Sequence, residues 1–224
     1  DEHVRIINSA ASDLLTIVND ILDFSKMEAG KLTINQKPFS PRDAFEDIAS
    51  LMAKSAHLKQ LEFIFDIDTL PSVLIGDNFK LKQLMSNLLS NALKFTNYGQ
   101  IVLRAKSLQF GDDNYMLSFE VEDTGIGISN LDKEKLFKPF NQLDDELNRS
   151  FQGTGLGLVI CQELVFLMRG SIEVQSHYSK GSKFTIDLPF KKVNDQVIPV
   201  VQNRFVSKIA GIYDPIPQSR KITC

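Results

Sequence analysis

The apolar residues at the start of the chain follow a heptad pattern. The 3.5-residue repeat over residues 4–29 predicts one helix of a bundle or coiled coil, with Gly30 as its C-terminal cap. The repeat consists of Val4, Ile7, Ala11, Leu14, Val18 and Ile21, and Leu15, Ile17, Leu22 and Phe24 widen the stripe. A helix this apolar needs partner helices, and nothing else in the chain repeats its heptad. The segment therefore indicates part of a bundle.

The pattern changes after residue 36, where helical and alternating segments mix. Ser40 and Pro41 form a typical helix start, as N-cap and first helical residue. Further helices are predicted over 78–95 and 154–168, and strands over 61–67, 101–105, 117–121, 172–175 and 184–188. Residues 111–114 are typical of a hairpin turn, and 128–152 form a long irregular loop. Because strands and helices do not alternate strictly, we expect an α+β sandwich, with helices on one face of a mostly antiparallel sheet.

Composition narrows the function classes only slightly. The chain has 224 residues, with 43% hydrophobic residues, 24% charged residues and a formal net charge of −3. No basic excess indicates a nucleic-acid partner, and no apolar stretch has the length of a membrane span. Cys161 and Cys224 are too few and too far apart for a disulfide framework. Cys161 lies in an apolar helical run and is predicted to be a buried free thiol, which is compatible with the cytoplasm.

Three polar residues share one edge of the helix predicted over 78–95. At 3.6 residues per turn, Asn87, Asn91 and Lys94 fall within about 60° of one another, beside the apolar stripe. Two carboxamides and an ammonium group in this arrangement could hold Mg²⁺ and a phosphate chain. The same residues would also be ordinary on a solvated helix edge.

Two glycine-rich segments add further candidate chemistry. In the first, an apolar strand runs into Asp123, Gly125 and Gly127. The carboxylate could accept a hydrogen bond from the amino group of adenine. The two glycines let the backbone pass close to a flat ring or adopt a positive φ. This segment alone could equally be a structural turn or a metal loop.

The second segment places Gly153, Gly155 and Gly157 at alternate positions before a helix. Backbone N–H groups at a helix N-terminus can bind phosphates. The spacing is neither that of a Walker A loop nor that of a Rossmann fingerprint. A glycine-rich turn without a ligand remains an alternative for this segment taken alone. The three elements together predict one nucleotide site, because each supplies a different part of it.

The motifs resemble the ordered boxes of the sensor histidine kinases of two-component systems. Residues 87–96 (NLLSNALKFT) resemble the N box, 123–128 (DTGIGI) the G1 box, 136–140 (LFKPF) the F box, 153–158 (GTGLGL) the G2 box, and 181–185 (GSKFT) the final strand motif. Their order and spacing match over roughly residues 1–190. The resemblance is greatest to the hybrid kinases.

This resemblance implies a Bergerat-type (GHKL) sandwich that binds Mg-ATP and takes part in phosphorelay signal transduction. Asn91, with Asn87 nearby, would bind Mg²⁺, Lys94 would meet the phosphates and Asp123 would receive the adenine amino group. Residues 128–152 would form an ATP lid. The remaining ATP-binding residues would be Gly125, Gly127, Arg149, Gly153, Thr154, Gly155, Leu156, Gly157 and Thr185.

Other positions in the resemblance have less definite roles. Phe137 and Phe140 would pack the base of the lid, although core packing explains them equally well. Gln152 and Arg169 depart from the family pattern, in which glycines are frequent at both positions. These departures predict altered turn geometry rather than loss of binding.

The resemblance also implies a domain organisation. Residues 1–31 would be the second helix of the dimerisation and phosphotransfer bundle, without the helix that carries the phosphoacceptor histidine. Residues 36–190 would be the catalytic domain. Residues 191–224 would contain a linker and a weak likeness to the start of a receiver domain over 208–220, where Asp214 is the single acidic residue.

The implied partners are ATP, a response-regulator receiver domain, and a second copy of the full-length protein through the bundle, in a parent that can be membrane-anchored. We expect an enzyme that transfers the γ-phosphoryl group of ATP to a histidine outside this chain. One alternative is a regulatory or interaction module that binds nucleotide without transferring phosphate. A gyrase-type or mismatch-repair-type ATPase is disfavoured, because no glutamate base lies within one turn of Asn87 on the helix.

Overall fold

The computed structural model describes residues 2–141 and 154–193. The first helix, α1, runs from Glu2 to Glu28, and Gly30 follows it with a φ of +62°. The Gly30 N–H donates to the Met27 carbonyl and the Lys31 N–H to the Lys26 carbonyl, which completes the C-terminal cap. The predicted heptad helix and its glycine cap are therefore confirmed.

Three helices, α2, α3 and α4, follow α1 in the described residues before the G2 box. α2 spans Pro41–Leu58 and begins as predicted, with the Ser40 hydroxyl accepting from the Asp43 N–H at 3.2 Å. α3 spans Asn78–Phe95 and is capped by Asp77, whose carboxylate accepts from the Lys80 N–H at 3.0 Å. α4, Asn130–Lys133, is a short helix within the region predicted to be irregular.

The last described helix is α5, Gly157–Leu167, which begins three residues later than the sequence predicted. It ends at a turn in which Arg169 has a φ of +59° and the Gly170 N–H donates to the Val165 carbonyl at 2.9 Å. Arg169 therefore adopts the left-handed conformation that favours glycine.

Seven strands form one mixed sheet in the described part of the chain. Their order is β1-β3-β7-β5-β4-β2, and β6 also pairs with β7. Only the β2–β4 pair is parallel. The strands are β1 (Lys37–Phe39), β2 (Glu62–Ile67), β3 (Leu74–Gly76), β4 (Gln100–Phe110), β5 (Asn114–Asp123), β6 (Ser171–His177) and β7 (Gly181–Lys192).

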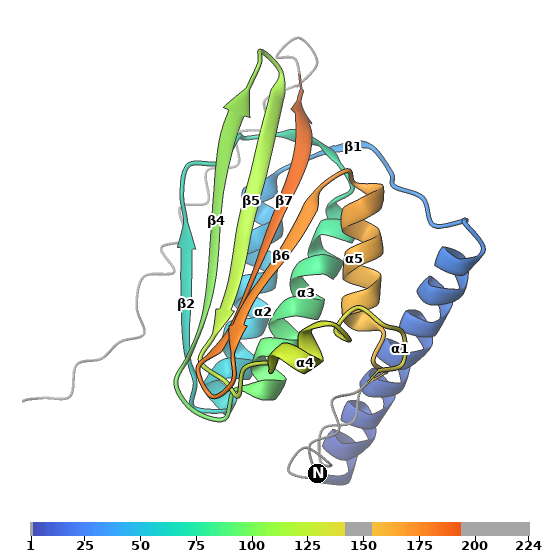
Figure 1. The fold of residues 1–224 in the computed structure, drawn as a ribbon, viewed down its shortest axis with the longest axis vertical. Helices are drawn as coiled ribbons and strands as arrows, with labels where there is room; N and C mark the ends of the chain where they lie inside the picture. Colours follow the sequence, from blue (N-terminus) through green and yellow to red (C-terminus); the bar gives the residue numbers. More distant parts are fainter. Residues whose placement is uncertain (1, 142–153, 194–224) are drawn as a thin grey trace, which may run out of the picture. The chain divides into compact units, whose positions relative to one another are not determined.

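The core lies between one face of this sheet and helices α2, α3 and α5 (Figure 1). On the sheet side, residues at every second position of β5 and β7 are buried, as the period of two requires. On the helix side, α3 contributes an almost fully buried stripe of Leu81, Leu84, Met85, Leu88, Leu89 and Ala92. The predicted fold, an α+β sandwich with helices on one face, is confirmed.

The structure differs from the prediction in two short strands that were not predicted and in strands that are longer than predicted. β1 and β3 were not predicted, because three residues are too few to show an alternating pattern. β4 and β7 extend beyond their predicted ends because they pair with long partners. No helix in the described ranges is long and apolar enough to cross a membrane.

Candidate functional site

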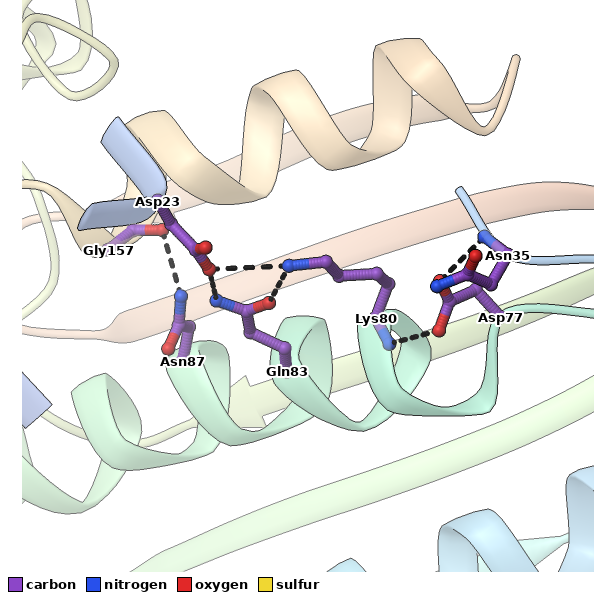
Figure 2. A network of polar contacts seen from close by, with 7 residues as sticks. All are labelled: Asp23, Asn35, Asp77, Lys80, Gln83, Asn87 and Gly157. Carbon is purple, nitrogen blue, oxygen red and sulfur yellow. Dashed lines mark hydrogen bonds and ion pairs between the residues drawn. The ribbon is translucent and has the colours of Figure 1, made fainter. Parts of the chain in front are cut away.

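Helix α3 carries the N-box residues and is hydrogen-bonded to the glycine-rich segment at the start of α5. The Asn87 side-chain nitrogen donates to the Gly157 carbonyl at 3.2 Å (Figure 2). Asn87 also contacts the buried thiol of Cys161, one turn into α5. Burial raises the pKa of Cys161 to about 12, partly offset by this contact with Asn87. The predicted buried free thiol is confirmed, and the N-terminus of α5 is held against α3.

The other two residues of this edge are partly exposed. The Lys94 ammonium lies 4.9 Å from the centroid of the Phe95 ring, and burial lowers the Lys94 pKa. Lys94 has no carboxylate partner within the described residues. Asn91 likewise makes no side-chain hydrogen bond to a described residue. A partly buried cation beside the Asn91 amide can attract an anion.

Asp123 lies at the end of β5 and is buried. Its carboxylate accepts from the Gly125 N–H at 2.8 Å and from the backbone of Ser182. Burial nevertheless raises the pKa of Asp123, since removal from water disfavours the charged form more than these two hydrogen bonds favour it, and Glu122 adds repulsion. The carboxylate is thus fixed in direction, which suits a specific hydrogen-bond acceptor.

The turn after Asp123 is fastened to two other segments. The Ile126 N–H donates to the Phe95 carbonyl at the end of α3, at 3.3 Å. The Ile126 carbonyl accepts from the Ser179 N–H at 2.6 Å, and the Ile128 N–H donates to the Ser176 hydroxyl at 2.8 Å. The turn therefore bridges α3 and the β6–β7 turn.

The glycines of this turn are required by backbone packing. A Cβ at Gly125 would lie 2.3 Å from the Phe95 carbonyl oxygen, and one at Gly127 would lie 2.0 Å from the His177 carbonyl oxygen. Gly127 also has a φ of +67°. The sequence predicted that these glycines let the backbone pass close to a flat ring or adopt a positive φ. The structure shows the positive φ at Gly127 and close approach of both glycines to other backbone.

The described part of the G2 segment contacts helix α1. The Thr154 hydroxyl donates to Asp20 at 2.9 Å and accepts from the Leu156 N–H at 3.2 Å. Gly155 follows with a φ of +68°, and Leu156 is buried. Arg149, Gly153 and Gln152, which the sequence also singled out, lie outside the described residues.

Phe140 lies just before residues 142–153, which are not described, and Thr154 follows directly after them. Its ring meets that of Phe24 on α1 edge-on, with 5.4 Å between centroids, while the residue is 64% exposed. Phe137 is half-buried. Phe140 therefore contacts α1 and stays largely exposed.

Thr185 is the one described candidate that the structure places away from the others. It pairs with Glu120 on β5 and with Glu173 on β6, between the buried residues Phe184 and Ile186. Alternation puts Thr185 on the face opposite the helices. Ser182 pairs with Asp123 and is buried on the helix-facing side. Thr185 stays a prediction as a site residue, but the residue of β7 that the register sets beside Asp123 is Ser182.

Sequence reasoning missed several polar residues around Asp123. Ser176 donates to the Gly181 carbonyl at 2.9 Å and lies 3.0 Å from the Ser182 hydroxyl. The Thr96 hydroxyl is fully buried and has no hydrogen-bond partner in the described part of the chain. Such a group calls for an explanation, and a ligand at this site would supply one. The G-S-K-F run was the available signal, but only the β5–β7 register shows that Ser182 faces Asp123.

Comparisons with known proteins agree with this geometry. The model of the family described as histidine kinase-, DNA gyrase B- and HSP90-like ATPase matches residues 76–192, just over half of the chain. The sensor histidine kinase GacS of Pseudomonas protegens is 45% identical over 196 residues, which are 87% of this chain and 21% of GacS. Hybrid signal transduction histidine kinase L of Dictyostelium discoideum is 42% identical over 192 residues, 85% of this chain and 11% of that protein.

A solved structure extends the comparison to three dimensions. The crystal structure of full-length ShkA in complex with AMPPNP matches with a TM-score of 0.72 and 29% identity, over 86% of this chain and 39% of that chain. The chain therefore belongs to the histidine kinase-, DNA gyrase B- and HSP90-like ATPase family. Within that family it is a catalytic ATP-binding domain of the sensor histidine kinase type, as its motifs predicted.

The first prediction concerns the packing of Gly127. We expect Gly127→Ala to lower the free energy of unfolding by about 3 kcal/mol or more, since positive φ and overpacking against the His177 carbonyl both oppose a side chain. Gly30→Ala is a matched control, with a similar φ of +62° and no atom within 4 Å of the added Cβ. It should lose only about 1–2 kcal/mol. Urea denaturation measures both, and equal losses would contradict the packing account.

The second prediction concerns the pH dependence of stability. Because the pKa of Asp123 is raised above 3.8 in the folded protein, its carboxyl group binds its proton more tightly there than in the unfolded chain. The stability that this proton contributes is present below the unfolded pKa and is lost as pH rises through the folded pKa. Wild type should therefore lose stability relative to Asp123→Asn as pH rises from about 4 towards neutrality.

Denaturation at a series of pH values measures this difference. Asp112→Asn is the control, because it makes the same chemical change at the exposed hairpin turn, away from Asp123. A wild-type protein that gains stability over Asp123→Asn on raising the pH would show that the folded state favours the ionised carboxylate.

Proposed function

We propose that this chain binds Mg-ATP between α3 and the two glycine-rich segments and serves as the kinase module of a sensor histidine kinase. The observation that supports this most is the pair of bonds made by α3. Its Asn87 side chain donates to the carbonyl of Gly157, the first residue of α5, and its Phe95 carbonyl accepts from the Ile126 N–H in the turn after Asp123. The two glycine-rich segments, which are far apart in sequence, therefore both contact α3, which carries Asn87, Asn91 and Lys94.

The two ends of this edge suit the two ends of ATP. Asp123 and its neighbour Ser182 would receive the adenine base, together with the Thr96 hydroxyl, which has no hydrogen-bond partner among the described residues. The ammonium of Lys94 and the backbone around Thr154–Gly157 would receive the phosphates. Gly125 and Gly127 hold the turn against backbone, so that the carboxylate keeps its direction.

The donor set fits Mg²⁺ shared with phosphates. Asn87 and Asn91 can offer amide oxygens, and the Asn87 nitrogen already donates to Gly157. No group of three or more His, Cys, Asp or Glu among the described residues could hold a metal ion alone. Mg²⁺ commonly combines a few protein oxygens with substrate phosphates and water. When bound, the ion would neutralise charge that develops on the transferred phosphoryl group.

The wider setting is also a proposal, because the chain spans only about a tenth to a fifth of the length of the curated relatives named above. Residues 1–31 would belong to the dimerisation and phosphotransfer bundle, 36–190 to the catalytic domain, and 191–224 to a linker that leads towards a receiver-like domain. The apolar side chains of Leu14, Val18 and Ile21 on α1 are exposed, which supports partner helices and a homodimer.

The phosphoryl group would pass from ATP to a histidine outside this chain and then to an aspartate of a response-regulator receiver domain. The module itself would act in the cytoplasm, including in a membrane-anchored parent. Residues 194–224, where the receiver-like segment was predicted, lie outside the described residues.

The third prediction tests the metal site. Replacing Asn91 with Ala should weaken Mg-ATP binding by about tenfold, because one metal ligand is lost, and should change Mg-free ATP binding much less. Isothermal titration with and without Mg²⁺ measures this. Asn114→Ala, at the opposite end of β5 from Asp123, is the control and should bind as wild type does. Equal Mg-ATP affinity in Asn91→Ala and wild type would remove Asn91 from the site.

The fourth prediction separates nucleotide binding from phosphoryl transfer. We expect this chain alone to bind ATP without phosphorylating itself. Transfer needs an imidazole in line with the γ-phosphate and a partner that takes its proton. His57 and His177 are exposed and form no ion pair with a described residue.

The assay is incubation with γ-labelled ATP and Mg²⁺, followed by acid and base treatment. Acid-labile, base-stable label that disappears in His3→Gln would make His3 an acceptor and contradict this prediction. A longer chain that also carries the proposed phosphoacceptor helix and its histidine should become labelled. Binding without labelling in that longer protein would favour the regulatory module over the kinase.

A further inference from the structure

Helix α1 contacts the catalytic domain through one polar and aromatic stripe. Asp20, Asp23 and Phe24 have the i, i+3, i+4 spacing that places residues on one helix face. Each contacts a different segment: Asp20 bonds Thr154, Asp23 bonds α3, and Phe24 meets Phe140. The exposed leucines and isoleucines of α1 remain available to other helices. One helix can therefore serve the bundle and the catalytic domain at the same time.

The centre of this stripe is an ion pair with few solvent contacts. Asp23 lies 3.3 Å from the Lys80 ammonium, and the two side chains are 15% and 11% exposed. Gln83 donates to the same Asp23 oxygen at 2.8 Å and accepts from Lys80 at 2.9 Å (Figure 2). These bonds fix α1 beside α3, one turn away from Asn87.

One turn earlier on α1, Asp20 reaches the N-terminal end of α5. Its carboxylate accepts from the Thr154 hydroxyl, which also accepts from the Leu156 N–H. Its charge also acts on Cys161, one turn into α5. Leu156, the N-cap of α5, supplies no side-chain hydrogen bond. A carboxylate therefore lies at a helix end that favours negative charge and lacks a cap of its own.

We propose that Asp20 occupies the place of a phosphate at this glycine-rich segment, so that docking of α1 and binding of the nucleotide triphosphate oppose each other. This inference rests on the proposed function, because it names the regulation of that same site. The Thr154 hydroxyl cannot donate to Asp20 and to a phosphate oxygen at once. The Asp20 charge also repels a phosphate chain at close range.

The opposition acts in both directions. A ligand that binds the undocked form more tightly lowers the population of the docked form, and docking lowers the affinity for the ligand by the same factor. Rearrangement of the bundle could thus change the ATP affinity of the catalytic domain through α1. The effect should scale with the charge of the phosphate chain and leave the adenine end unaffected.

The test compares ligands of different charge in the chain of residues 1–224. Asp20→Asn keeps an oxygen that can accept from Thr154 and removes the negative charge. With Mg²⁺ held constant, isothermal titration should show ATP binding about tenfold tighter in Asp20→Asn than in wild type. ADP should gain less, and adenosine should be unchanged.

Two further variants separate the causes. Glu28→Gln makes the same charge change at an exposed position of α1 and should bind all three ligands as wild type does. Asp23→Asn loosens the ion pair with Lys80 without touching Thr154 and should also tighten ATP binding. Far-ultraviolet circular dichroism confirms that each variant is folded.

The outcomes distinguish this inference from the proposed function. If neither wild type nor any variant binds ATP, the proposed nucleotide site itself is wrong. If ATP binds but Asp20→Asn leaves its affinity equal or weaker, the opposition is overturned. If Asp20→Asn tightens ATP binding while Asp23→Asn does not, the link to α1 docking is overturned.

Discussion

The candidate site depends on how one stripe of α3 is buried. Leu81, Leu84, Met85, Leu88 and Leu89 are almost completely removed from water between the sheet and α5. Burial of these side chains fixes the rotation of the helix about its own axis, because any other rotation would expose apolar surface. This rotation also fixes the direction of the polar edge that carries Asn87, Asn91 and Lys94. The hydrogen bonds from this helix to Gly157 and Ile126 follow from that rotation.

A second constraint is the dense backbone packing behind Asp123. Gly125 and Gly127 let the turn touch carbonyl groups of α3 and of the β6–β7 turn, where no side chain would fit. This packing removes water from the Asp123 carboxylate, which disfavours its charge, and also supplies two backbone donors that hold it in one direction. The result is an acceptor with a fixed direction, obtained at some loss of stability when the carboxylate is charged. Sites with buried, oriented polar groups commonly combine these two effects.

Helix α1 carries two sets of side chains with different surroundings. Its heptad leucines and isoleucines in the described part are exposed, which is compatible with the proposed bundle. Asp20, Asp23 and Phe24 contact the catalytic domain instead, and they reach residues on both sides of 142–153. A single rigid helix that contacts two partners can transmit a change from one to the other, because it moves as a unit.

The sequence by itself determined the class of fold, the family and most of the candidate residues. Helical and alternating periodicities specify which face of each element is buried, and the glycine-rich boxes are local features with fixed spacing. Tertiary structure decided three other matters. The β5–β7 register placed Ser182, and not Thr185, beside Asp123. The contacts of Gly125 and Gly127 proved to be backbone, and those of Asp20 and Asp23 proved to lie on the catalytic domain. Each of these depends on segments distant in the chain, and periodicity within one segment carries no information about its neighbours in space.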